Sequence, residues 1–321
     1  MNYIIFDLEW NQGSDEEHAE NRNVPFEIIE IGAVKLNEKK EICGTYNRLI
    51  KPQIFKEFHY ITKKMMQMDI QELDKEAYFV DIYQEFIEWC GKDYIFGTWG
   101  PLDLLELQRN MRYYGIPALS DGPIAFLDIQ KLFSIAFEDK KSRRALEYAV
   151  DYLHIYKDIP FHRAFSDAYY TGKVFAEIKN PKIEKNVSFD MFTPPKDRKS
   201  EVKINFETYS KYISREFEDK QEAMSNREVI STKCYLCHKN LRKKIRWFST
   251  NGKHYLSVSY CDKHGLMKGK IRLRKSENNK VYVIKTLKFI SKEEADKIRS
   301  KKNKSKTIKE KETVTPTKVW K

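Results

Sequence analysis

The stretch IIFDLEWN, residues 4–11, places two carboxylates, Asp7 and Glu9, inside an otherwise apolar run. Its alternation is typical of a β-strand, in which successive side chains point to opposite faces. Asp7 and Glu9 therefore share one face, and the intervening apolar side chains share the other. Two like charges this close are costly unless a cation lies between them. The strand is either an exposed edge with two solvated acids or one wall of a cation site.

The length and charge of the chain suggest two domains of different character. Its 321 residues, 41% of them hydrophobic, can bury a sizeable core. Through Asn180 there are 22 Lys and Arg against 30 Asp and Glu, and after it 37 against 17, so the net charges are −8 and +20. A basic second half suits a polyanion such as nucleic acid. Residues 301–321 alone could equally be a solubilising tail.

Hydropathy and the N-terminal sequence bear on the location of the protein. No run approaches the ~18 uninterrupted apolar residues of a membrane span. The N-terminus carries Asp7 and lacks the long apolar core of a signal peptide. We therefore expect a soluble, cytoplasmic protein that makes no membrane contact.

The first half alternates between strand and helix patterns. After a polar loop over 11–25, apolar periodicity predicts further strands at 27–36, 41–52 and 93–100 and helices at 74–91, 103–115, 143–155 and 162–178. Mixed strands with helices packed around them indicate an α/β domain over residues 1–180.

Two further acids fall where these elements begin. Asp103 lies where the strand at 93–100 gives way to a helix, and its spacing to Glu106 is that of a capping box, so it could simply cap that helix. Asp167 lies in the helix that begins near His162 and could be a solvated helix residue. Four carboxylates from three separate elements can instead hold a pair of divalent ions roughly 4 Å apart, which suits in-line attack on a phosphodiester.

His162 precedes Asp167 by five residues. With a helix beginning just after Pro160, its imidazole would lie at the helix entrance, while Asp167 projects from the first turns. A histidine can take a proton from an attacking water near neutral pH. We favour this role over a structural hydrogen bond because of the surrounding acids.

These residues carry a family resemblance. The segments FDLEWN, EIIEIGAV, GTWGPLDLLEL and FHRAFSDAYYTGKVF, in this order and at these separations, resemble the DEDDh (DnaQ-like) 3′-to-5′ exonucleases. The match covers roughly residues 1–180, its specific part is the H-x4-D ending, and it is most similar to the Eri-like branch, whose members trim RNA 3′ ends. The resemblance implies an RNase H-like mixed sheet flanked by helices. It also implies that His162 is the general base and that two Mg²⁺ or Mn²⁺ ions are bound by Asp7, Glu9, Asp103 and Asp167.

A mechanism follows from the resemblance as a hypothesis. One ion, held mainly by Asp7 and Asp167, would serve the attacking water, and the other would stabilise the leaving 3′-oxygen. The product would be a nucleoside 5′-monophosphate. Glu9 could accept a hydrogen bond from the terminal 3′-hydroxyl. Trp10 could stack on the terminal base, although core packing suits it equally well.

Beyond Asn180 the pattern changes. Residues 181–230 begin with polar runs and two adjacent prolines, typical of a linker, and continue with a stretch over 204–230 that favours a helix. Residues 231–292 form a small β-rich module that resembles a zinc ribbon. Residues 293–321 are predicted to be a basic, disordered tail.

The five cysteines argue for a metal site rather than a disulfide framework. Cys43 and Cys90 stand alone and are expected to be core thiols. The ligands of one structural Zn²⁺ are predicted in two pairs, C-x2-C and C-x2-H, on either side of strand-like sequence with a turn at 251–252: Cys234, Cys237, Cys261 and His264. His238 and His254 are alternative fourth ligands, and His264 is preferred because it completes the second pair.

Basic and aromatic residues interleave in the same module. Such a surface can follow a phosphate backbone and stack on bases. The residues proposed to bind substrate here are Arg242, Lys243, Lys244, Arg246 and Trp247. A zinc ribbon can equally serve protein contacts.

Two functions from different classes remain. The first is a metal-dependent 3′-to-5′ exonuclease that acts on single-stranded nucleic acid, with RNA favoured over DNA. The second is a nucleic-acid-binding or regulatory protein that uses the nuclease fold and the zinc ribbon for recognition. The complete acidic set with His162 favours the enzyme, because four converging carboxylates without metal would repel a polyanion.

Overall fold

A computed structural model describes residues 1–13, 24–66, 68–276 and 278–313, with side chains described through Lys304. The loop predicted over 11–25 lies mostly outside the described residues. The chain divides into two compact units, the first formed by residues 1–120 and 124–192 and the second by 121–123 and 193–321. Among the described residues, no helix combines the length and the apolar character that crossing a membrane requires.

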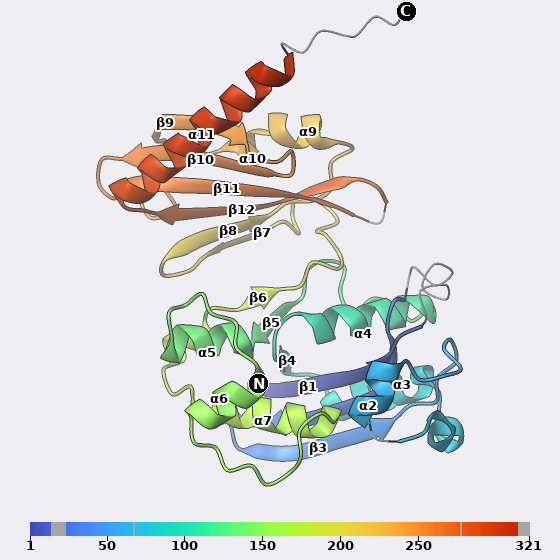
Figure 1. The fold of residues 1–321 in the computed structure, drawn as a ribbon. Helices are drawn as coiled ribbons and strands as arrows, with labels where there is room; N and C mark the ends of the chain where they lie inside the picture. Colours follow the sequence, from blue (N-terminus) through green and yellow to red (C-terminus); the bar gives the residue numbers. More distant parts are fainter. Residues whose placement is uncertain (14–23, 67, 277, 314–321) are drawn as a thin grey trace, which may run out of the picture. The chain divides into compact units, whose positions relative to one another are not determined.

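The first unit is built on a mixed six-stranded sheet with the order β3-β2-β1-β4-β5-β6 (Figure 1). Strands β1 to β3 are antiparallel neighbours, β4 and β5 run parallel to β1, and β6 is antiparallel to β5. The bounds are β1 Asn2–Asn11, β2 Glu27–Leu36, β3 Ile42–Leu49, β4 Tyr94–Thr98, β5 Ala125–Asp128 and β6 Ser188–Phe189. The predicted α/β domain with a mixed sheet is confirmed.

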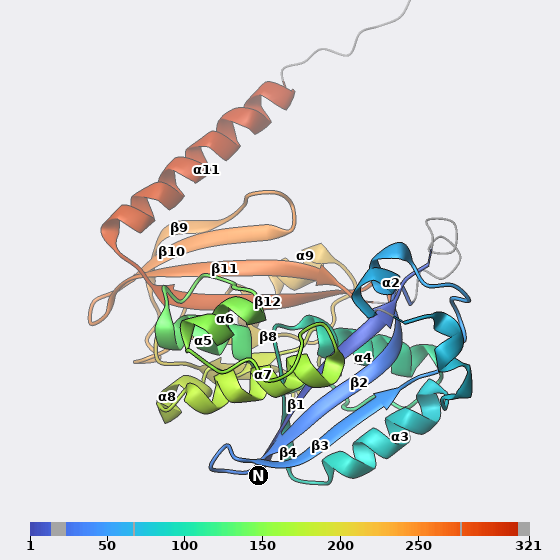
Figure 2. The ribbon, with the colours of Figure 1, turned by 60° about the horizontal axis from the view of Figure 1, so that its bottom comes forward.

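Helices cover both faces of this sheet (Figure 2). One core packs α3 and α4 on the sheet, and a second packs α5, α6 and α7 on the opposite face. The bounds are α3 Phe79–Cys90, α4 Leu102–Tyr113, α5 Ile129–Phe137, α6 Leu146–Tyr152 and α7 Ala164–Glu177. Four helices of this unit were not predicted: α5 and the shorter α2 Tyr60–Met66, 3₁₀ helix η1 Ile70–Lys75 and α8 Pro181–Glu184.

The alternation of β1 decides which way its acids point. Phe6 and Leu8 belong to the core under α3 and α4, whereas Ile5 belongs to the core under α7. Asp7 and Glu9 have the parity of Ile5, so they face the side of α7. The predicted separation of the two faces of this strand is confirmed.

Gly32 on β2 lets α7 approach the sheet closely. It lies opposite Asp7 in the β1–β2 register. A Cβ at position 32 would lie 2.0 Å from the Phe165 nitrogen and 2.1 Å from the Ala164 carbonyl carbon, both in the first turn of α7. Only glycine permits this contact, which brings the helix turn carrying Asp167 onto the strand.

The second unit is a six-stranded antiparallel sheet with the order β7-β8-β12-β11-β10-β9. The bounds are β7 Val202–Asn205, β8 Tyr209–Ile213, β9 Arg242–Ser249, β10 His254–Cys261, β11 Gly265–Lys275 and β12 Val281–Phe289. Helices α9 Lys220–Ser225 and α10 Arg227–Ile230 pack in one core, and α11 Lys292–Thr313 packs in another through Ala295 and Ile298. The turn predicted at 251–252 joins β9 to β10, with Gly252 at φ 77°.

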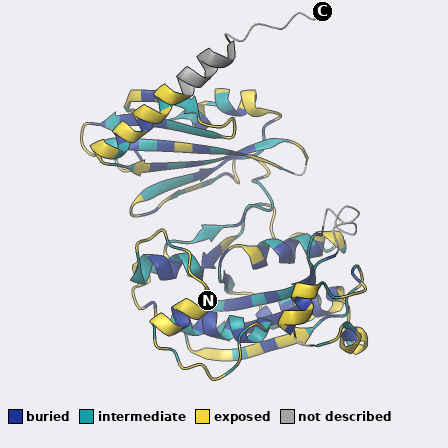
Figure 3. Ribbon diagram, viewed as in Figure 1, coloured by how far each residue is buried: buried dark blue, intermediate teal, exposed yellow. Residues whose placement is uncertain are grey.

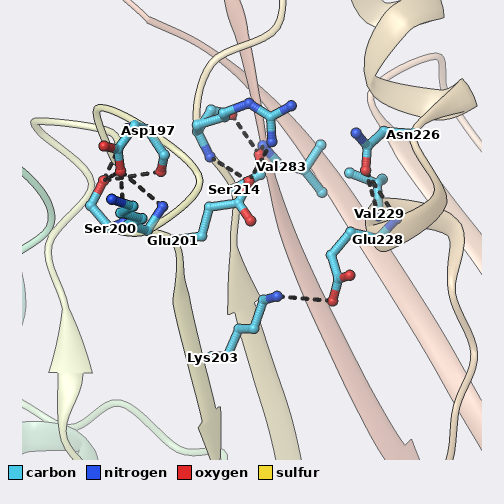
Figure 4. Close-up of polar contacts among 11 residues, drawn as sticks. Asp197, Ser200, Glu201, Lys203, Ser214, Asn226, Glu228, Val229 and Val283 are labelled. Atoms are coloured by element: carbon cyan, nitrogen blue, oxygen red, sulfur yellow. Dashed lines mark hydrogen bonds and ion pairs between the residues drawn. The ribbon is translucent and has the colours of Figure 1, made fainter.

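The helix predicted over 204–230 is wrong at its start, because β8 pairs with β12 as an inner strand. Its five residues, YSKYI, show no alternation of apolar and polar side chains, and the adjacent Tyr212 and Ile213 are both buried. Polar contacts tie the same stretch into the unit (Figure 4). Lys203 of β7 pairs with Glu228 of α10 at 3.0 Å.

Two further predictions differ from the structure. Residues 293–313 form most of α11 instead of a disordered segment, because Ala295 and Ile298 anchor its first turns on the sheet. Cys43 is exposed rather than in the core, since it lies on the edge strand β3, whereas Cys90 is buried as predicted. Figure 3 shows the exposed residues of that strand.

Candidate active site and metal centres

Three of the predicted acids converge. One carboxylate oxygen each from Asp7, Glu9 and Asp167 lies within 4.8 Å of the others, and all three side chains are half-buried. Asp7 and Glu9 come from one face of β1, and Asp167 comes from the first turn of α7, which Gly32 holds against the sheet.

The fourth predicted acid, Asp103, interacts electrostatically with this group. It lies in the first turn of α4 and is only 6% exposed. Its carboxylate accepts a hydrogen bond from the Leu8 backbone and raises the pKa of Asp7. It does not cap α4, whose N-cap position is Pro101 and has no side-chain cap. Asp103 is therefore oriented toward the strand that carries the other acids.

The pKa values of all four acids are raised, because burial and the neighbouring negative charges disfavour their ionised forms. Burial, together with the charges of Asp103, Asp167 and Glu9, holds the pKa of Asp7 well above its ordinary value. Burial, followed by the charges of Asp167 and Glu30, raises the pKa of Glu9 to about 8. Burial raises the pKa of Asp103 to about 7, and burial also raises that of Asp167.

This donor set suits hard divalent cations. Carboxylate oxygens are the ligands that Mg²⁺ and Mn²⁺ prefer. A cation among Asp7, Glu9 and Asp167 would replace their mutual repulsion by attraction and favour the ionised forms. The residues present therefore fit the ions that the sequence predicts.

Glu30 and Arg163 belong to the site and were not predicted. Glu30 is fully buried and lies opposite Glu9 in the β1–β2 register. Arg163 binds it through two nitrogens, with Nε–Oε2 at 2.9 Å and Nη2–Oε1 at 3.1 Å. A buried carboxylate left without its partner costs about 3 to 5 kcal/mol. The available signal was the second acid of EIIEIGAV together with the cation after His162.

His162 lies beside the acids rather than among them. Its backbone N–H donates to Asp167 Oδ1 at 3.4 Å, and its φ of 68° is in the left-handed region, which is strained for a residue with a Cβ. The helix begins at Ala164, slightly later than predicted. The exposed side chain borders a hollow of about 440 Å³ that is also lined by Tyr60, Ile61, Lys64, Met65 and Phe161.

The two tryptophans proposed to stack on bases have packing roles. Trp10 packs against the core under α3 and α4, with its ring 5.4 Å from that of Phe26. Trp247 packs in the core with α9 and α10 and donates its indole N–H to the Ile230 carbonyl at 2.9 Å. The other predicted substrate-binding residues, all exposed on the edge strand β9, are Arg242, Lys243, Lys244 and Arg246.

The second unit brings together the four predicted zinc ligands. Cys237 Sγ lies 3.7 Å from Cys261 Sγ, and His264 Nδ1 lies 3.4 Å from Cys234 Sγ and 3.5 Å from Cys261 Sγ. Tetrahedral Zn–S bonds of about 2.3 Å require sulfur separations near 3.8 Å, so the set fits zinc.

The alternative ligands lie outside this group. His254, in β10, contacts Asn251 at 2.9 Å. His238 follows the first cysteine pair but is not part of the four-residue cluster. The choice of His264 as the fourth member agrees with the geometry.

Comparison with known proteins supports the fold and the family. The RNase T family model, described as an exonuclease, matches residues 4–175. No curated protein matches the chain. The nuclease domain of 3′hExo, a DEDDh family member bound to rAMP, is 17% identical over 59% of this chain and 97% of that one, with a TM-score of 0.50. A full-length 3′-exonuclease gives the same identity, the same coverage of this chain, 86% of its own length and a TM-score of 0.50. These likenesses confirm the RNase H-like fold, and the family match confirms the predicted resemblance.

We expect the acidic cluster to make stability depend on pH. Glu9 and Asp103 bind protons more tightly in the folded chain, with pKa values of about 8 and about 7, than at their ordinary values of 4.5 and 3.8. The free energy of unfolding in Mg²⁺-free buffer should therefore fall as the pH rises from about 4 to about 8, by a few kcal/mol. Mg²⁺ should reverse this loss, and it should raise the melting temperature more at pH 8 than at pH 5.

Glu9→Gln tests the origin of this pH dependence. Thermal unfolding followed by circular dichroism should show a flatter pH profile and a smaller effect of Mg²⁺ than for the parent chain. Glu57→Gln, at an exposed position of the same unit, is the matched control and should behave as the parent. Identical profiles for both variants would contradict the electrostatic account.

Proposed function

The chain belongs to the RNase T family of exonucleases, and from this premise we propose that it removes nucleoside 5′-monophosphates from the 3′ ends of single-stranded nucleic acid, with RNA favoured over DNA. The observation that carries the proposal is the convergence of Asp7, Glu9 and Asp167 within 4.8 Å. The polarity is supported by solved structures of the same fold that are 3′-exonucleases. One of these holds rAMP, a ribonucleotide, which supports the preference for RNA.

The cofactors of the proposed reaction are two Mg²⁺ or Mn²⁺ ions, with Asp7, Glu9, Asp103 and Asp167 as their ligands. Bound there, divalent cations would neutralise the scissile phosphate and make an attacking water more acidic. The raised pKa values of the acids support this assignment, because metal-free carboxylates at this density favour protonation.

The chain's own groups supply positioning and proton transfer. His162 takes the proton from the attacking water, since its exposed imidazole can reach solvent beside Asp167. Arg163 holds the neighbouring backbone in place through its two bonds to buried Glu30. Glu9 accepts a hydrogen bond from the terminal 3′-hydroxyl, which favours free ends over internal bonds.

The second unit holds one structural Zn²⁺ in this proposal, bound by Cys234, Cys237, Cys261 and His264. Its role is to fix the turn between β10 and β11 against the first cysteine pair. Arg242, Lys243, Lys244 and Arg246 on β9 supply positive charge for the nucleic-acid backbone.

We expect single-stranded RNA labelled at its 5′ end to yield a ladder of fragments shortened from the 3′ end, and only when Mg²⁺ or Mn²⁺ is present. Asp7→Asn should abolish the ladder, and His162→Ala should lower kcat by about 100-fold or more because the general base is lost. The measurement is denaturing gel electrophoresis of matched RNA and DNA substrates over time.

His154→Ala is the matched control, because His154 is also exposed and also has a positive φ, 54°. It should retain the activity of the parent chain. RNA that remains intact but is retarded in a native gel would instead favour the nucleic-acid-binding function without hydrolysis.

We also expect one Zn²⁺ per chain in the purified protein. Cys234→Ser should lose the metal and lower the melting temperature of the second unit, since small metal modules fold with their ion. Cys43→Ser, at an exposed thiol outside the cluster, should keep both. Atomic absorption and thermal unfolding provide the measurement, and an unchanged zinc content in Cys234→Ser would refute the ligand assignment.

A further inference from the structure

One face of β11 carries a row of cations. Lys268, Lys270, Arg272 and Arg274 alternate with buried residues, so all four project from the same face of the sheet. Successive members are about 6.8 Å apart, and the row spans about 20 Å at a rise of 3.4 Å per residue. This spacing is comparable to that of successive phosphates along an extended single strand.

Helix α11 turns part of this face into a groove. The helix packs on the sheet through Ala295 and Ile298. Beside it lies a groove of about 1260 Å³, which we call the basic groove. Its cationic lining comprises Lys268, Lys270, Lys297, Lys301 and Lys304.

The acids of the groove are largely engaged. Glu294 pairs with Lys268, and Asp296 pairs with Arg299 at 3.2 Å. The third acid, Glu293, lies with them in the first turns of α11, so the negative charge is confined to one end of the groove.

The remaining cations repel one another. Within the part of the chain that the structure describes, Lys270, Arg272 and Lys301 form no ion pair. Burial, followed by the charges of Arg272, Lys268 and Lys301, lowers the pKa of Lys270. A polyanion would relieve this repulsion and release its own counterions.

We propose that the basic groove and the cation row of β11 bind the phosphate backbone of single-stranded nucleic acid. The inference rests on the proposed function, because the bound strand is the substrate whose 3′ end is hydrolysed. The groove is separate from the metal cluster of the first unit and from the cations of β9.

Nucleic acid fits this surface better than an acidic protein segment does. The charge is arranged in a regular row along a strand, as a repeating polyanion requires, and residues after Asn180 carry a net charge of +20. The lining contains no Phe, Tyr or Trp, so little base stacking is expected. Binding should therefore depend strongly on salt and weakly on sequence.

A triple variant, Lys270→Ala with Arg272→Ala and Lys301→Ala, tests the proposal in the full chain. Its matched control removes the same charges from the exposed loop before β7: Lys196→Ala, Arg198→Ala and Lys199→Ala. Fluorescence anisotropy with labelled oligouridine measures affinity in an Asp7→Asn background, which prevents hydrolysis without a chelator. Circular dichroism and zinc content establish that each variant is folded.

The groove variant should bind at least about tenfold more weakly, and the slope of log K against log salt should fall by about 2, at 0.7 per lost contact. The control should stay within about twofold. Unchanged affinity in the groove variant would overturn the proposal and would favour an acidic protein segment as the ligand of the groove. An equal loss of affinity in the control would also overturn it.

A second readout separates this proposal from the proposed function. With Asp7 intact, the groove variant should hydrolyse the p-nitrophenyl ester of thymidine 5′-monophosphate at the parent's rate, since so short a substrate engages only the metal site. A parent chain that hydrolyses neither RNA nor the ester would refute the exonuclease, while the anisotropy comparison would still decide the groove.

Discussion

Mutual repulsion among closely spaced, partly buried acids is the constraint on which the first unit depends. Asp7 and Glu9 share one face of a core strand, Asp167 meets them from α7, and Asp103 adds its charge from α4. Nothing in this arrangement stabilises the fold by itself, because burial and like charge raise the pKa values of all four. The cluster makes physical sense as a site for divalent cations and, through them, for a phosphodiester.

The surrounding scaffold keeps the acids together. Gly32 removes the side chain that would push α7 off the sheet, so a single backbone position sets the approach of Asp167 to Asp7. Arg163 neutralises the fully buried Glu30 and anchors the residue next to His162. Two contacts thus stabilise the strained backbone of His162: the Arg163–Glu30 ion pair at the next residue, and the hydrogen bond from its own N–H to Asp167.

Local patterns in the sequence predicted the features that depend on the spacing of nearby residues. The alternation of β1, the helix carrying Asp167 and the two pairs of zinc ligands could all be inferred from spacing. The Glu30–Arg163 pair could not, because it joins residues from β2 and the start of α7 that only the tertiary fold brings together. Strand β8 was mistaken for helix because its five residues show no alternation with a period of two, and α11 was missed because few apolar residues anchor it.

The central claim is that the acidic cluster of the first unit binds catalytic divalent cations. Titration of the zinc-loaded chain with Mn²⁺, followed by electron paramagnetic resonance, tests it most directly. The account predicts saturable binding of two Mn²⁺ per chain in the presence of a nucleoside 5′-monophosphate, and loss of that binding in Asp7→Asn. Weak, unsaturable binding that is equal in the parent chain and in Asp7→Asn would contradict it.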